Sequence, residues 1–236
     1  LVLAVTAAVL PRGVGKTSAR AKFTQVFSNR AEINWLAGAR FFLFGARDVW
    51  FVVGLPVFLY SVLGWSFTQV GSFFAAWVIG YGLVQAAAPR LVRRSHDGAG
   101  PSGTTARSWA FALAVLPAAM AIGLHQGWDA QWVVVGGMVL FAVVFAINSA
   151  VHSYLILAYS DFDKVSMNVG FYYMANAGGR LAGTVLSGWA YQTHGLIACL
   201  WWSTAFVAAA ALLSLRLPNV TPPGAGRQQP SVEAIG

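Results

Sequence analysis

Three arginines and one aspartate lie inside otherwise apolar stretches of this sequence. Arg40, Arg47 and Asp48 belong to one stretch, residues 36–63, and Arg180 lies in a later one. At 1.5 Å per helical residue, Arg47 is about 17 Å from the start of its stretch, close to the middle of a ~30 Å hydrocarbon layer. A charge at that depth costs about 2.5 to 3.5 kcal/mol, so such residues face protein or a water-filled cavity. Because guanidinium matches the fork geometry of phosphate-like oxyanions, the pattern predicts an anion site.

Two of these charges, Arg40 and Arg47, also have an alternative interpretation. Arg40 lies near the start of its stretch, from where a long side chain can reach the membrane interface. Arg47 could form a buried ion pair with Asp48 or with an acid elsewhere. Because two or three arginines face a single carboxylate, we expect a positive cavity, with Arg47 and Arg180 as the main substrate ligands and Arg40 as a third candidate.

Polar residues recur every four positions in the stretch that holds Arg180. Asn168, Tyr172 and Asn176 precede it at this spacing, which places all four on one slowly turning face of a helix. Asn176 and Tyr172 are therefore candidate ligands for neutral oxygen atoms of a substrate. Hydrogen bonding between helices explains Asn168 and Tyr172 at least as well.

Small residues recur in the same stretch. Gly179, Gly183 and Ser187 follow a small-xxx-small spacing, which allows a neighbouring helix to approach closely. We expect these three residues to serve helix packing and not substrate binding.

Two further groups in the apolar stretches could carry a proton. His152 lies one helical turn after Asn148, with Ser149 and Ser153 beside them, and Asp48 lies in the earlier stretch. His152 and Asp48 are therefore candidates for coupling transport to protons, for example in an antiporter. The alternatives are a hydrogen-bonded structural histidine and an aspartate that only pairs with an arginine.

The composition is that of an integral membrane protein, whose main partner is the lipid bilayer. Hydrophobic residues make up 58% of the chain and charged residues 9%, with a mean hydropathy of +0.64. The net charge of +8 does not indicate nucleic-acid binding, because the basic residues lie between hydrophobic stretches and form no basic domain. Cys199 is the single cysteine, and His125, His152 and the aspartates do not cluster at ligand spacing. We expect no metal and no cofactor.

The order of polar and apolar segments predicts an all-α, polytopic protein in four parts. We expect the end of a truncated preceding transmembrane helix at 1–11, a basic cytoplasmic linker at 12–35, a six-helix transmembrane bundle at 36–217 and a disordered cytoplasmic tail at 218–236. The chain would then be the C-terminal part of a longer polypeptide, lacking an N-terminal six-helix half.

Six candidate spans divide the bundle, at about 36–63, 66–88, 108–126, 130–159, 165–192 and 196–217. Twelve Lys and Arg residues lie in the linker, the alternate loops and the tail, and none lies in the three opposite loops. Under the positive-inside rule, both ends of the bundle are cytoplasmic.

Six spans with both ends inside, preceded by a basic linker, resemble the C-terminal half of a major facilitator superfamily transporter. The resemblance implies a 3+3 inverted repeat and a substrate site near the membrane midplane between two six-helix halves.

The strings ARFFLFGARDVWFVVGLPVF (39–58) and GFYYMANAGGRLAGTVLSG (170–188) carry a more specific resemblance. They are similar to the organoarsenical efflux permeases of bacterial arsenic resistance, over most of residues 34–217. That family implies export of 1-arseno-3-phosphoglycerate across the bacterial inner membrane, with a glyceraldehyde-3-phosphate dehydrogenase as functional partner. It brings no binding residues with it, so the arginine site rests on the residues themselves.

Other functions fit part of the pattern. Buried arginines would equally serve an exporter of another small organic anion, such as an organophosphate or a carboxylate. A polytopic membrane enzyme or a sensor is a weaker alternative, because no nucleophile lies beside a plausible base and the loops are too short for a folded sensor domain. The sequence therefore predicts a secondary transporter and not an enzyme.

Overall fold

Every regular element in the described part of the chain is a helix. The computed structural model describes residues 28, 30–92, 100–160 and 165–219. Its helices are α2 (Ala31–Phe51), α3 (Gly54–Ser61), α4 (Phe67–Val92), α5 (Gly103–His125), α6 (Ala130–Tyr159) and α7 (Val165–Ser214). Five helical segments are long and apolar enough to cross a membrane, with α2 and α3 together forming the first. The chain is thus an all-helical, multi-pass membrane protein. The predicted preceding helix, most of the predicted linker and nearly all of the predicted tail lie outside the described residues, whereas residues 31–35, predicted as linker, form the first turn of α2.

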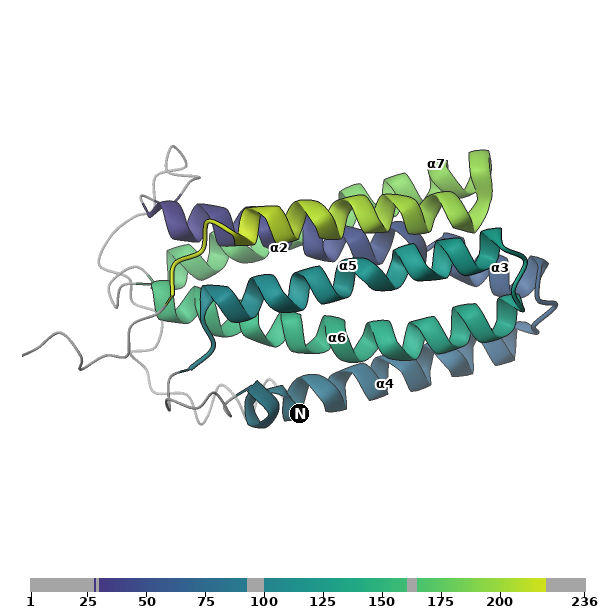
Figure 1. Ribbon diagram of the computed structural model, residues 1–236, viewed down its shortest axis with the longest axis horizontal. Helices are drawn as coiled ribbons and strands as arrows, with labels where there is room; N and C mark the ends of the chain where they lie inside the picture. The colour runs from purple at the N-terminus through teal and green to yellow at the C-terminus, as the bar shows by residue number, and fades with distance from the viewer. Residues whose placement is uncertain (1–27, 29, 93–99, 161–164, 220–236) are drawn as a thin grey trace, which may run out of the picture.

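The last helix, α7, reverses direction at a glycine. Gly195 has φ 73° and ψ −167°, a non-helical conformation inside an otherwise helical run. Positive φ is easily adopted only by glycine, and here it lets the second arm fold back along the first (Figure 1). The spans predicted at 165–192 and 196–217 are therefore the two arms of α7.

Prolines affect the predicted spans in different ways. The first span is interrupted between Phe51 and Gly54, because Pro56 lacks an N–H and its ring clashes with the carbonyl four residues earlier. Pro117 is accommodated inside α5. That helix begins five residues before the predicted start at 108, because Ser102 caps it by accepting a hydrogen bond from the Thr105 backbone N–H.

Helix α2 lies between the two arms of α7. On the first arm, a Cβ at Gly183 would lie 2.5 Å from the carbonyl oxygen of Gly45, and a Cβ at Gly179 would collide with the Phe41 carbonyl. Ser187, further along, accepts a hydrogen bond from the Gly54 backbone N–H at 3.1 Å. The three small residues thus form the contact at which α2 and the first arm of α7 run side by side in parallel.

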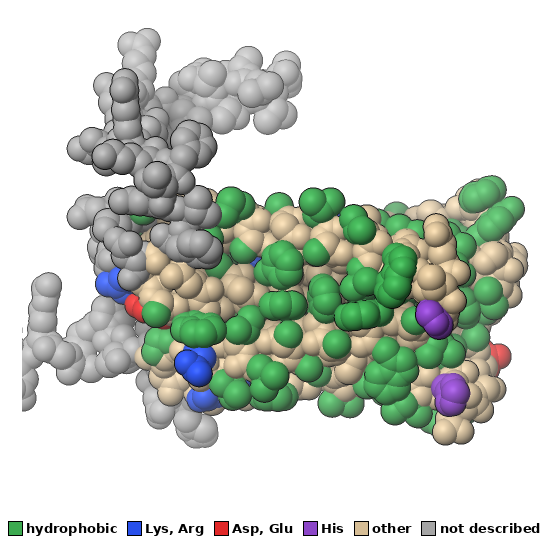
Figure 2. All heavy atoms as spheres, turned by 90° about the horizontal axis from the view of Figure 1, so that it is seen from above, with side chains coloured by type: hydrophobic (Ala, Val, Ile, Leu, Met, Phe, Trp, Pro, Cys, Tyr) green, Lys and Arg blue, Asp and Glu red, His purple; other side chains and the backbone are tan. Residues whose placement is uncertain are grey.

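The two ends of the bundle differ in charge. The Tyr159 hydroxyl donates to the Pro218 carbonyl and Arg30 donates to the Tyr159 carbonyl, so the ends of α2, α6 and α7 meet. Figure 2 shows most of the visible Lys and Arg at one end of the molecule and His at the other, with hydrophobic side chains between them. The turns at 62–66 and 126–129, at the second end, contain no Lys or Arg.

Candidate functional site

Asp48 joins two of the predicted arginines. Its Oδ1 accepts a hydrogen bond from Arg47 Nε at 2.6 Å, and its Oδ2 accepts one from Arg180 Nε at 3.0 Å. Asp48 is 1% exposed, so this carboxylate lies in the interior of the bundle. A residue of α2 thus fixes one arginine from its own helix and one from the first arm of α7.

The two arginines differ in exposure. The Arg47 side chain is 13% exposed, whereas that of Arg180 is 54% exposed. Arg180 lies 15 residues, or about 22 Å, from the start of α7, which places it near mid-height of the bundle. A half-exposed arginine at that height is costly against lipid, so this face requires water or further protein beside it.

Aromatic rings surround the Arg47 guanidinium. Its Cζ lies 5.1 Å from the ring centroid of Phe44, 5.5 Å from that of Phe145 and 5.9 Å from that of Phe51. Such cation–π contacts stabilise a cation outside water by about 0.5 to 2 kcal/mol. Phe145 on α6 was not among the predicted site residues, although it lies on the same side of that helix as Asn148 and Ser149, three and four positions later.

Arg40 is held within the bundle. Its Nε donates to Asn176 Oδ1 at 3.0 Å, and its Nη1 donates to the carbonyl and hydroxyl oxygens of Ser149 at 3.2 and 3.1 Å. Its Cζ lies 3.9 Å from the ring centroid of Phe44 and 4.9 Å from that of Tyr172. Only 4% of Arg40 is exposed, so its guanidinium is turned towards α6 and α7 and not towards the end of the bundle.

The polar stripe on α7 contacts α2 and the residue Ser28 that precedes it. Asn168 accepts a hydrogen bond from the Ser28 hydroxyl, Tyr172 and Asn176 contact Arg40, and Arg180 pairs with Asp48. The structure therefore brings Asn176 and Tyr172 to Arg40, one to two turns away from the Arg47–Asp48–Arg180 group. Asn176 and Tyr172 remain predicted ligands. They share α7 with Arg180 but lie beside Arg40 of α2.

The predicted pair on α6 is buried and lacks partners. Asn148 is fully buried and His152 is 1% exposed. Neither amide atom of Asn148 and neither ring nitrogen of His152 has a hydrogen-bond partner among the described residues. These two side chains lie one turn apart, next to Ser149, which binds Arg40.

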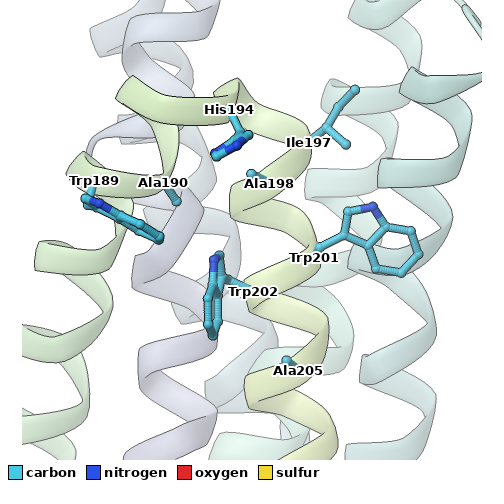
Figure 3. Close-up of a pocket in the computed structure, with 8 residues that line it drawn as sticks. All are labelled: Trp189, Ala190, His194, Ile197, Ala198, Trp201, Trp202 and Ala205. Atoms are coloured by element: carbon cyan, nitrogen blue, oxygen red, sulfur yellow. The ribbon is translucent and has the colours of Figure 1, made fainter.

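A separate pocket opens between the arms of α7, near their turn. It has a volume of about 530 Å³, and Figure 3 shows Trp189, Trp202 and His194 around it. None of the predicted site residues lines this pocket. Because tryptophan is common where a membrane protein meets the lipid–water interface, the pocket fits that interface better than it fits an anion.

Comparisons with known proteins do not identify the family. No protein-family model matches the chain, and no curated protein is significantly similar to it. The described residues contain no group of three or more His, Cys, Asp or Glu side chains placed to hold a metal ion.

Proposed function

We propose that this chain forms part of a membrane transporter for small organic anions, in which Arg47 and Arg180 hold the anion. The observation that supports this function is the arrangement at Asp48. Both guanidiniums contact the carboxylate through Nε, and no described residue accepts a hydrogen bond from the Nη groups of either. Each arginine thus has a pair of donors left for an oxyanion, already oriented.

The charge balance favours an anion. Away from the ends of the bundle, the described spans contain three arginines, namely buried Arg40, largely buried Arg47 and half-exposed Arg180, but only one carboxylate, that of Asp48. A phosphate-like or carboxylate group placed between Arg47 and Arg180 would offset the excess positive charge. A neutral substrate would leave that charge uncompensated in a medium of low dielectric constant.

The exposure of Arg180 supports a second wall of protein. We propose that another six-helix unit, as in major facilitator transporters, faces this side of the bundle and encloses the anion between the two units. Rocking of the units around a site at mid-height would then open it to each side in turn. The basic end of the bundle would be cytoplasmic, and transport would be outward across the bacterial inner membrane.

The proposed substrate is 1-arseno-3-phosphoglycerate, and it rests on the resemblance of strings 39–58 and 170–188 to organoarsenical permeases. This molecule has an anionic group at each end of a three-carbon chain, which suits two guanidiniums on different helices. A glyceraldehyde-3-phosphate dehydrogenase would form it from arsenate, so export would confer arsenate resistance.

The test is arsenic uptake into everted membrane vesicles that contain the full-length protein. Each reaction supplies arsenate and glyceraldehyde 3-phosphate, with or without active dehydrogenase and its nicotinamide cofactor. Uptake that requires the enzyme is the expected result. Uptake of arsenate alone would reject the arseno-ester while keeping an anion transporter. If no arsenic is taken up, uptake of a labelled organophosphate or carboxylate into the same vesicles would assign the other anion class.

The arginine site has its own test in the same vesicles. Arg47→Ala should reduce transport at least 100-fold, because it removes one of the two anion ligands, and it should leave membrane insertion intact. Arg107→Ala is the matched control, since Arg107 contacts Thr104 in the first turn of α5. Normal flux in Arg47→Ala would show that Arg47 does not bind the substrate.

A further inference from the structure

His152 and Asn148 form a buried polar pair that the anion site does not use. A neutral imidazole has one donor and one acceptor, and a primary amide has two donors and an acceptor. None of these groups is satisfied among the described residues, although both side chains are almost completely buried. A buried polar group without a hydrogen bond destabilises the folded protein by about 1 to 3 kcal/mol. The presence of two such side chains, one turn apart, therefore calls for a functional explanation.

The pair lies beside a charged cluster. Ser149, which follows Asn148 directly, accepts hydrogen bonds from Arg40, and the charge of Arg40 acts on the His152 ring. Tyr172 of α7 belongs to the same hydrophobic cluster as Val151 and Leu155, the neighbours of His152 on α6. Other titratable side chains on α6 and on the helices packed against it have contacts of their own or are exposed: Tyr81 lies beside Phe145, Arg107 donates to Thr104, Tyr154 is exposed, and Tyr159 donates to Pro218.

No free carboxylate is available to His152 among the described interior residues. Asp48 already gives one oxygen to Arg47 and the other to Arg180. A proton on the imidazole therefore adds a positive charge to an interior that already has an excess of them. An anion arriving at the arginines removes part of that excess, and the free Oδ1 of Asn148 is one turn away to accept the imidazolium N–H.

We propose that His152 is a proton-binding site linked to the anion site, so that it takes up a proton when the anion binds. The inference rests on the proposed anion-binding function and adds a proton whose binding is linked to that of the anion, and the residue that binds it. Linkage is reciprocal, so the anion must also bind more tightly at low pH through His152. An unperturbed imidazole changes its charge between pH 5 and 8, so this is the pH range in which a linked proton on His152 is tested.

The experiment is calorimetric titration of the purified full-length protein with 3-phosphoglycerate, a stable anion of the proposed class. Titrations in two buffers of different ionisation enthalpy give the number of protons taken up per anion bound. The ligand's own phosphate also titrates, but equally in every variant. The wild type should take up more protons per anion bound than His152→Gln. Lowering the pH from 8 to 5.5 should increase the affinity of the wild type for 3-phosphoglycerate by a factor roughly tenfold larger than the factor for His152→Gln.

The controls separate the two proposals. His194→Gln alters an exposed histidine at the other end of the bundle and should match the wild type. Equal proton uptake in His152→Gln and the wild type, with binding intact, would overturn the proton site alone. A wild type that binds no 3-phosphoglycerate at any pH would overturn the anion site and the proton link together.

A measurement on the unmutated protein removes dependence on how the variant folds. NMR spectra of protein containing ¹⁵N-labelled histidine distinguish neutral imidazole from imidazolium. We expect one buried ring to change from neutral to charged when 3-phosphoglycerate is added at pH 6.5. Histidine spectra unchanged by saturating ligand would overturn the proton link.

Discussion

At the scale of single residues, Asp48 determines the geometry of the proposed site. A carboxylate that binds one guanidinium through each oxygen holds the two arginines at a fixed separation before any ligand arrives. Orienting ligands in advance reduces the entropy lost on binding. Asp48 is therefore better suited to positioning Arg47 and Arg180 than to carrying a proton.

Replacing Arg180 by lysine tests the fork geometry. Arg180→Lys keeps the positive charge but loses the planar pair of Nη donors, so we expect roughly tenfold weaker anion binding, about 1.4 kcal/mol. The apparent KM for uptake into vesicles measures the change. Arg107→Lys, at the end of the bundle, should leave KM unchanged; an unchanged KM in Arg180→Lys would assign Arg180 a structural function.

Replacing Asp48 by asparagine tests the charge balance. Removing one partner of a fully buried ion pair costs about 3 to 5 kcal/mol, and we expect less here because Arg180 is half-exposed. The melting temperature in detergent should fall for Asp48→Asn, and added phosphate should restore part of it by supplying a new negative charge.

A variant of a second, exposed aspartate is the control for the effect of phosphate on the melting temperature. Asp129→Asn changes an exposed residue that accepts a hydrogen bond from the Trp132 backbone N–H at the start of α6. Phosphate should not raise its melting temperature above the rise seen in the wild type. An equal response of both variants to phosphate would mean that the anion does not bind at Asp48.

At the scale of helices, the contact between α2 and the first arm of α7 builds the site. The backbones approach closely where Gly183 packs on Gly45 and where Gly179 packs on the Phe41 carbonyl. Further along, the backbone N–H of Gly54 donates a hydrogen bond to the Ser187 hydroxyl. Close backbone approach at these points sets the register of the two helices. That register brings Asp48 to Arg180, so a packing motif that binds no ligand determines whether the site forms.

A methyl group at this contact should disturb both packing and function. Gly183→Ala would force the helices apart, at a cost of about 1 to 3 kcal/mol, and should lower both the melting temperature and the transport rate. Gly188→Ala, on the same arm, meets nothing within 4 Å and should be neutral or slightly stabilising. Equal melting temperatures for the two variants would show that the Gly45–Gly183 contact is not close-packed.

At the scale of the whole molecule, the two ends of the bundle differ chemically. Arg90 and Arg216 lie at the end of the bundle where α2 begins and α6 ends. The turns at 62–66 and 126–129, at the opposite end, contain neither Lys nor Arg. Large exposed tryptophans mark that opposite end: Trp128, Trp132, Trp189, Trp201 and Trp202. Basic residues confined to one end are the pattern of a protein with a fixed orientation in its membrane, and tryptophans are common at membrane interfaces.

Cysteine labelling measures that orientation. Arg90→Cys and Gln126→Cys place exposed thiols at opposite ends, while the native Cys199 is buried and should remain unlabelled. A membrane-impermeant maleimide should label Gln126→Cys in intact cells and Arg90→Cys only in everted vesicles. The reverse result would place the basic end outside and overturn the proposed direction of transport.

Composition and periodicity were enough to predict the class of protein and which apolar segments contain its charges. Long apolar segments are stable in a lipid bilayer, where each must satisfy its own backbone hydrogen bonds as a helix. The helical membrane architecture and most helix bounds were therefore predictable. The four-residue period of Asn168, Tyr172, Asn176 and Arg180 likewise placed them on one face, since that spacing follows from helix geometry.

Which of these charges contact one another depends on how the helices pack. Arg47 and Asp48 are adjacent in sequence, but the contact between Asp48 and Arg180 joins residues 132 positions apart and depends on the register of α2 against α7. The same register brings Asn176 to Arg40, and the packing of α6 leaves His152 without a hydrogen-bond partner among the described residues. Periodicity within one helix cannot specify such pairings, because they depend on how closely two separate helices approach and at what height.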